Sequence, residues 1–159
     1  MKAWLELPDD EYDKIWERFY SEFKFNPSVY PKNFPGIREP SPSITYSVAD
    51  ASKFINDLDA QMLAVLRRII APEARLYVLD WQHACFWFYP HVAGSEAFER
   101  SVFPDGDYHI FLAEDFSLGI FGHPWEQTVC VFGERLIEVM EQHRPRLFSQ
   151  VLRRNGQAA

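Results

Sequence analysis

The feature that most constrains the fold is a change in hydrophobic periodicity near residue 74. Before it, apolar side chains recur at the three- and four-residue spacing of amphipathic helices, and after it they form short runs of strand length. Helices are predicted at 9–24, 48–70, 134–143 and 146–154, and strands at 75–81, 84–90, 107–113, 116–121 and 126–132. Strands clustered mid-chain between helices predict an α+β fold, in which an antiparallel sheet of about five strands carries helices packed mainly on one face.

The length of 159 residues fits a single globular domain over 1–159. A chain of this size buries roughly 68–70% of its unfolded surface, which is enough for folding without metals or disulfides. The proline-rich segment 26–46 is predicted to run extended within the domain, and the polar tail 155–159 is predicted to be frayed.

Aromatic residues make up 16% of the chain. Large rings fill volume at little entropic cost, so the simplest interpretation is a core built on aromatics. An alternative is that some of them line a pocket or a partner surface, where aromatics are enriched. The residues predicted to form the core are Trp16, Phe19, Phe54, Leu58, Leu66, Val78, Phe86, Phe88, Ile110, Leu112, Val129 and Val131.

The net charge of −7 disfavours binding to nucleic acid or to a membrane surface and favours a basic protein partner. The N-terminal residues lack the apolar stretch of a signal peptide, and no run approaches the length of a membrane span. Cys85 and Cys130 lie in apolar runs without a paired spacing, so both are expected to be reduced and packed in the core. These features together predict a cytoplasmic protein.

No motif in the chain fixes a reaction. A nucleotide-binding glycine loop, a nucleophile elbow and the usual histidine or cysteine spacings of metal sites are all missing from the sequence, so neither a cofactor nor a metal is expected. The alternative for a metal is a site assembled from ligands on separate strands. The candidate ionisable groups are His83, His91, His109, His123 and Glu126, with Asp80, Asp105, Asp107 and Asp115 as partners. Whether the protein is an enzyme stays open at this point.

Two tryptophan-containing segments are the best candidates for a binding site. The segment HPWEQ gathers His123, Trp125 and Glu126 before the last strand, and LDWQH places Trp81 and His83 at the end of another strand. An imidazole beside a carboxylate can act as an acid–base couple, whereas in a purely structural role these groups would satisfy backbone atoms. The hypothesis is that the two segments meet and line one concavity.

Several strings resemble a known bacterial family over nearly the whole chain. They are FNPS (25–28), EPSPSITYS (39–47), LDWQH (79–83), FPDGDYHIFLAEDF (103–116) and FGHPWEQTVCVFG (121–133). The chain is similar in these strings to the domain-of-unknown-function 2716 family. The resemblance implies a stand-alone bacterial protein, and it assigns no activity and no catalytic residue.

Two functional hypotheses follow. The first is a non-enzymatic protein-interaction module, of which a toxin-neutralising immunity protein is one specific form, because acidic charge and surplus aromatics suit binding to a basic partner. The alternative is an enzyme or binder of a small molecule, with a pocket near His83, His123 and Glu126.

Overall fold

A computed structural model describes residues 1–50, 54–92, 94 and 98–159 of the chain. Its strands form one nine-stranded sheet in the order β1-β4-β3-β5-β6-β7-β2-β8-β9, in which every neighbouring pair is antiparallel. The strands are β1 Trp4–Glu6, β2 Ser43–Ser47, β3 Leu76–Asp80, β4 Phe86–Phe88, β5 His109–Ala113, β6 Gly119–His123, β7 Thr128–Phe132, β8 Val151–Arg154 and β9 Gln157–Ala158. The helices are α1 Asp9–Phe23, the short 3-10 helix η1 Pro31–Asn33, α2 Ile55–Ile69 and α3 Glu134–His143. The predicted α+β class is confirmed, but the sheet is larger than the five strands expected.

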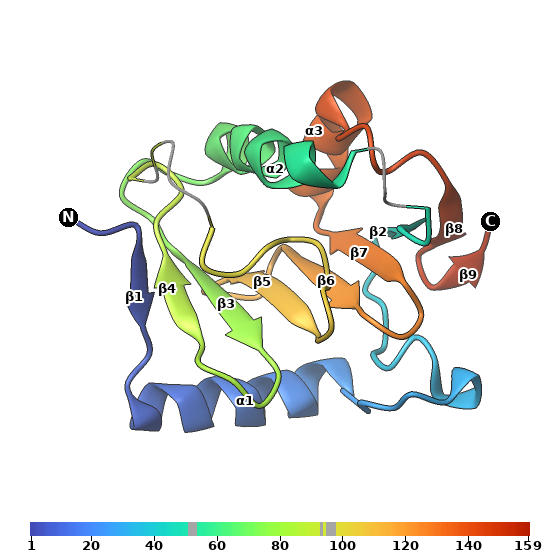
Figure 1. Ribbon diagram of the computed structural model, residues 1–159, viewed down its shortest axis with the longest axis horizontal. Coiled ribbons are helices and arrows are strands. Elements are labelled where there is room, and N and C mark those ends of the chain that lie inside the picture. The colour runs from blue at the N-terminus through green and yellow to red at the C-terminus, as the bar shows by residue number, and fades with distance from the viewer. Residues whose placement is uncertain (51–53, 93, 95–97) are drawn as a thin grey trace.

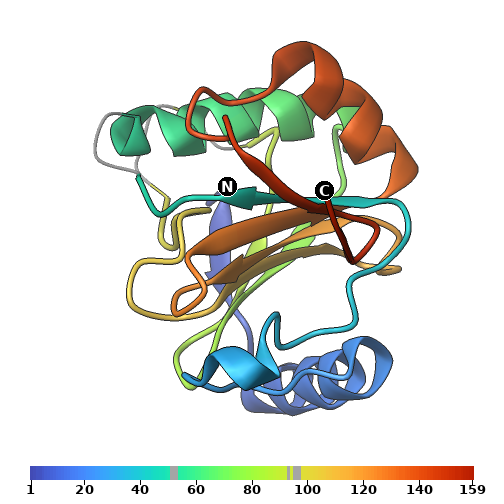
Figure 2. The ribbon, with the colours of Figure 1, turned by 90° about the vertical axis from the view of Figure 1, so that its right-hand side faces the viewer.

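The sheet is covered on both faces, which corrects the expectation of helices packed mainly on one face. Figure 2 shows α1 on one side of the sheet and α2 with α3 on the other. The β5 strand illustrates the cause, because Ile110 and Leu112 pack in the cluster under α1 while Phe111 packs in the cluster under α2. Successive strand residues point to opposite faces, so a strand that is apolar at every position needs cover on both sides.

The predicted core is largely confirmed. Of the residues predicted to be buried, only Phe54 is partly exposed, and it packs against the edge of the α2 cluster. Cys85 and Cys130 are buried and free, as expected. Burial raises the pKa of the Cys85 thiol to about 11 and that of Cys130 to about 12.

The C-terminal region differs from its prediction. No helix forms over 146–154, because β8 pairs there with β2 and so joins the sheet. The tail does not fray either, since β9 pairs with β8 through a turn at Asn155 and Gly156. Both turn residues have positive φ, 54° and 78°, which is the backbone of a type I′ hairpin.

The other predicted boundaries shift by a few residues. The proline-rich segment 26–46 contains η1 and the first residues of β2 rather than extended chain alone. Helix α2 begins at Ile55, later than predicted, and residues 51–53 of the predicted helix lie outside the described residues. Among the described residues, no helix combines the length and apolarity needed to cross a membrane.

Candidate functional site

The turn between β3 and β4 carries Trp81 and His83 and lies against α1 (Figure 1). The indole N–H of Trp81 donates a hydrogen bond to the hydroxyl of Tyr20 on α1, at 2.9 Å. The Trp81 ring also meets the Tyr108 ring edge-on, with centroids 5.8 Å apart. The position of Trp81 is therefore fixed from the helix and from the sheet.

An open pocket of about 230 Å³ lies between this turn and the helix. Its lining, which we call the aromatic pocket, consists of Tyr12, Trp16, Tyr20, Trp81 and Gln82. The three helical residues recur every four positions, so they project from one side of α1. Tyr20 and Trp81 are both partly accessible to solvent, so aromatic surface faces the pocket.

A polar depression of about 320 Å³ adjoins the aromatic pocket and shares Tyr12 and Gln82 with it. Its lining adds two exposed carboxylates, Glu6 and Asp9, together with His83. Aromatic surface and negative charge therefore lie side by side. This combination suits a cation, because ring faces and carboxylates both attract positive charge.

Helix α1 adds further negative charge near the pocket. Over positions 9–17 the acidic residues are Asp9, Asp10, Glu11, Asp13 and Glu17, against the single base Lys14. Acids in the first turn stabilise the helix dipole, but Asp13 and Glu17 lie beyond that turn. Both are exposed, and each lies three residues before a pocket ring, Trp16 and Tyr20 respectively.

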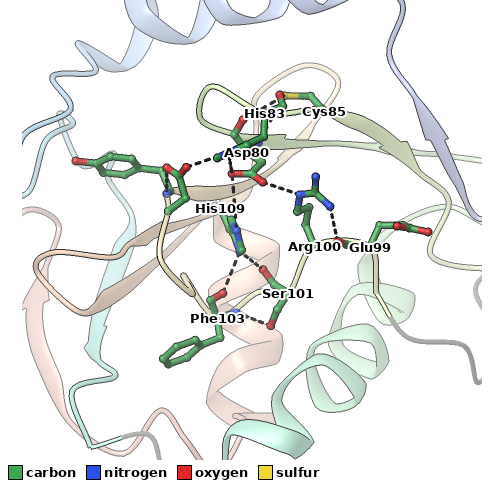
Figure 3. Close-up of polar contacts among 10 residues, drawn as sticks. Asp80, His83, Cys85, Glu99, Arg100, Ser101, Phe103 and His109 are labelled. Carbon is green, nitrogen blue, oxygen red and sulfur yellow. Dashed lines mark hydrogen bonds and ion pairs between the residues drawn. The ribbon is translucent and has the colours of Figure 1, made fainter.

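A second group of side chains lies on the other side of the same turn, around the buried Asp80 (Figure 3). One carboxylate oxygen of Asp80 accepts a hydrogen bond from Arg100 Nε at 2.6 Å. The other lies 3.2 Å from His83 Nδ1 and 3.9 Å from His109 Nε2. His83 Nδ1 is also 3.0 Å from Asp107 Oδ2. Burial raises the pKa of the Asp107 carboxyl, and the nearby charge of Asp80 raises it further.

His109 is oriented by the backbone. Its Nδ1 lies 2.8 Å from the carbonyl oxygen of Ser101 and 3.0 Å from that of Phe103. Carbonyl oxygens only accept hydrogen bonds, so Nδ1 carries the proton, and Nε2 faces Asp80. Its side chain is only 8% exposed.

The segment HPWEQ forms the turn between β6 and β7. His123 ends β6 and is buried, and its Nδ1 accepts hydrogen bonds from the backbone N–H groups of Trp125 and Glu126, at 3.2 and 3.1 Å. The imidazole proton therefore lies on Nε2, which is buried and has no hydrogen-bond partner among the residues that the structure describes. Burial lowers the pKa of His123 to about 4. Trp125 is 52% exposed.

The carboxylate of Glu126 is engaged by Arg153 on β8. Both of its oxygens accept hydrogen bonds from Arg153 at 2.8 Å, and Thr128 donates another at 2.7 Å. Arg153 binds Glu39 in the same two-point manner, at 2.8 and 3.0 Å. His123 thus holds the backbone of this turn, and the Glu126 carboxylate ties the turn to β8. Glu126 meets the His123 ring through its backbone N–H, and its carboxylate makes no hydrogen bond to that ring.

The two tryptophan segments lie at the same end of the sheet and share a neighbour, Tyr108. Its ring centroid is 5.8 Å from that of Trp81 and 4.8 Å from that of His123. Neither the aromatic pocket nor the polar depression includes His123, Trp125 or Glu126 in its lining, whereas Trp81 and His83 each line one of them.

Sequence reasoning did not assign Tyr12, Trp16 and Tyr20 to a site, although their helical spacing was visible as an aromatic stripe. It named Asp80, Asp107 and His109 as candidates without placing them together. The described residues Asp80, His83 and Asp107 present ligand atoms within 4.8 Å of one another, where the spacing in the sequence predicted no metal site.

Comparison with known proteins identifies the family. The profile of the family described as "Protein of unknown function (DUF2716)" matches residues 6–137. The chain belongs to this family. It is also 30% identical over 162 residues to the uncharacterized protein YxiI of Bacillus subtilis, a match that covers 93% of this chain and 98% of the relative. No solved structure matches the chain.

Proposed function

We propose that this DUF2716 protein is a binding module for a basic partner protein, and that a cationic side chain of the partner enters the aromatic pocket. The observation that carries the proposal is the ring lining of Tyr12, Trp16, Tyr20 and Trp81 beside exposed carboxylates. A cation over an aromatic face gains roughly 0.5–2 kcal/mol, and more when water is excluded. The net charge of −7 would speed the approach of a basic partner.

The size of the pocket favours a protein side chain over a free metabolite. Pockets for small molecules usually enclose about 300–1,000 Å³, and they bury most of the ligand. The aromatic pocket holds about 230 Å³, enough for one side chain of an arginine or lysine. Neutralisation of a basic bacterial toxin, the specific interaction expected from the sequence, would be one form of this function.

The Tyr20–Trp81 hydrogen bond prepares the pocket for binding. It joins the helix to the turn, so both rings are held before a ligand arrives. A preformed pocket binds more tightly because little side-chain entropy is lost on binding. The residues that we expect to contact the partner are therefore on rigid elements.

The test uses a capped hexa-arginine peptide, with the hexa-citrulline peptide as its uncharged counterpart of the same shape. Calorimetric titration in buffer containing EDTA should show binding of the arginine peptide only. Trp81→Ala should weaken this binding by about 30-fold, as expected for an interface anchor worth about 2 kcal/mol. Trp81→Phe, which keeps a ring but loses the N–H donor, should retain more of the affinity.

Trp125→Ala is the matched control, since Trp125 is an exposed tryptophan outside the pocket lining. Circular dichroism would check that each variant is folded. Equal affinity for the two peptides would refute a cation site. A loss of affinity on Trp125→Ala and none on Trp81→Ala would instead place the site at the β6–β7 turn, and losses on both would favour the hypothesis that the two tryptophan segments line one site.

Charge is tested separately from the rings. The double variant Asp13→Asn and Glu17→Gln should weaken arginine-peptide binding and reduce its dependence on salt, because these carboxylates flank the pocket rings. Glu138→Gln with Glu141→Gln removes two exposed charges from α3, on the opposite face of the sheet, and should have less effect. Equal losses in both double variants would indicate attraction by net charge alone.

A further inference from the structure

We propose that Asp80, His83, Asp107 and His109 bind a divalent transition-metal ion, for which Zn²⁺ is the best fit. The first three offer ligand atoms that lie within 4.8 Å of one another. Two imidazoles and two carboxylates are a common donor set for zinc, whereas magnesium and calcium prefer oxygen ligands alone. The site is distinct from the aromatic pocket, and the proposal does not depend on partner binding.

The distances suit one ion. Ligand atoms at about 2.1 Å from a tetrahedral metal are separated by roughly 3.4 Å. His83 Nδ1 lies 3.2 Å from Asp80 Oδ1 and 3.0 Å from Asp107 Oδ2. His109 Nε2 lies 3.9 Å from Asp80 Oδ1. Shifts of a few tenths of an ångström would bring the atoms of Asp80, His83 and Asp107 to the required spacing, and His109, which lies outside their 4.8 Å group, would move further to join them.

The buried imidazole is the observation that distinguishes this cluster from a group of surface acids. The Nδ1 of His109 lies against the carbonyl oxygens of Ser101 and Phe103, which fixes the ring so that its other nitrogen, Nε2, faces Asp80. At 3.9 Å, Nε2 makes no hydrogen bond with this carboxylate. An imidazole that is held through one nitrogen by backbone carbonyls, with the other nitrogen turned toward a carboxylate, has the usual orientation of a metal-ligating histidine.

The two carboxylate ligands, Asp80 and Asp107, are also hydrogen-bonded to groups outside the cluster, as metal ligands usually are. Arg100 holds the Asp80 oxygen that points away from the cluster, at 2.6 Å. The backbone N–H of Tyr108 donates to Asp107 Oδ1 at 2.8 Å, which leaves Oδ2 directed at His83. Each carboxylate therefore keeps one oxygen for the ion.

A metal ion can enter the proposed site from solvent on the side of His83. The side chain of His83 is 58% exposed, while those of Asp80 and His109 are each 8% exposed. An ion can thus reach the buried ligands past His83, which would close over it. His83 Nδ1 needs a proton to donate to either carboxylate, and a bound metal would take the place of that proton.

The experiment is calorimetric titration of the full chain with ZnCl₂, with MgCl₂ as the comparison cation. We expect one zinc ion per chain and no comparable binding of magnesium. His83→Ala and Asp107→Asn should each weaken zinc binding by at least about 10-fold, since even outer partners of metal ligands are worth about 10–100-fold. His143→Ala, which removes an exposed histidine at the end of α3, is the matched control and should leave the affinity unchanged.

A second readout keeps the proposal testable if a variant fails to fold. In ¹⁵N-labelled wild-type protein, long-range ¹H–¹⁵N spectra should show zinc bound through Nδ1 of His83 and Nε2 of His109. No stoichiometric zinc binding to the wild type would overturn the proposal. Binding that His143→Ala weakens as much as His83→Ala does, or spectra in which His109 does not respond, would also overturn it. Because the peptide titration is done with EDTA, neither result affects the proposed partner site.

Discussion

Removing Arg153 should cost the protein about 3–5 kcal/mol of its free energy of unfolding. The guanidinium makes four hydrogen bonds of 2.8–3.0 Å to two carboxylates, those of Glu39 and Glu126. Four separate charge-assisted hydrogen bonds of roughly 1.5–3 kcal/mol each would sum to more than this loss. The net loss is smaller because folding of the Arg153→Met variant no longer includes the cost of removing the cation from water. The expected net loss is that of breaking a buried ion pair by deleting one partner.

The environment explains the size of this effect. The side chains of Arg153, Glu39 and Glu126 are 17%, 1% and 13% exposed. Without the arginine, two carboxylates remain together in a nearly dry site. Arg154→Met is the matched control, because the neighbouring residue on β8 is exposed and the change in charge and composition is the same. A surface charge of this kind is worth about 1 kcal/mol at most.

The assay is urea unfolding at two pH values. Burial acts to raise the pKa of Glu126, but hydrogen bonds from Arg153 and Thr128 outweigh it and hold this pKa below its usual value. In the wild type, the stability from Glu126 is therefore present above the pKa of the unfolded state and is lost as the pH falls through the folded pKa. In Arg153→Met, protonation relieves the uncompensated charge, so the gap between variant and wild type should narrow from pH 8 to pH 5. Adding Glu39→Gln and Glu126→Gln should recover part of the loss. Equal costs for Arg153→Met and Arg154→Met would refute the reasoning.

Two further predictions concern buried titratable groups. Burial lowers the pKa of His123 to about 4, so its ring stays neutral in the folded protein, whereas in the unfolded chain it takes up a proton below its pKa of about 6.5. This difference should lower the free energy of unfolding by up to about 3 kcal/mol between pH 7 and pH 4. In His123→Asn, calorimetry should show a smaller dependence of stability on pH. Cys85 and Cys130, with pKa values raised to about 11 and about 12 by burial, should react with a thiol reagent only slowly in the native protein and fast in urea, and rapid native labelling would contradict their packing.

The strands of the sheet centre were predictable because their sequences are apolar at nearly every position. The same property indicates that both faces of the sheet are covered, which conflicts with the prediction of helices mainly on one face. A strand with one face in water should alternate, yet β5 and β7 are buried on both parities, for example at Val129 and Cys130. The aromatic helix α1 and the apolar helix α2 therefore had to cover opposite faces.

The C-terminal hairpin carried a signal that was not used. Asn-Gly is a strong indicator of a two-residue hairpin turn, and it stands at 155 and 156 between two short strands. Asn155 also receives a hydrogen bond from the Ser43 backbone N–H at 2.9 Å, which ties the turn to β2. No local sequence pattern could predict this hydrogen bond between the turn and β2, because β2 lies more than a hundred residues earlier in the chain.

The aromatic pocket depends on contacts that local sequence does not encode. The spacing of Tyr12, Trp16 and Tyr20 predicts an aromatic side of α1, but the neighbouring Ile15 and Phe19 are equally apolar and are buried against the sheet. Which rings stay accessible is decided by where the β3–β4 turn meets the helix. That meeting is fixed by the hydrogen bond between Trp81 and Tyr20, two residues 61 positions apart.

The Asp80 cluster follows from strand order and register. Strand β3 pairs with β4 on one side and with β5 on the other, and Asp80 stands opposite His109 in the β3–β5 ladder. His83 then comes from the turn after β3, and Asp107 from the residues just before β5, so both reach the same end of these two strands. A slip of one residue in the ladder would turn the side chain of Asp80 or His109 to the opposite face and separate the ligand atoms. The cluster is thus set by the apolar residues that fix the register, such as Val78 and Phe111, which the sequence does identify as core or strand positions. What the sequence lacks is the order of the strands, and only that order makes neighbours of residues 80 and 109.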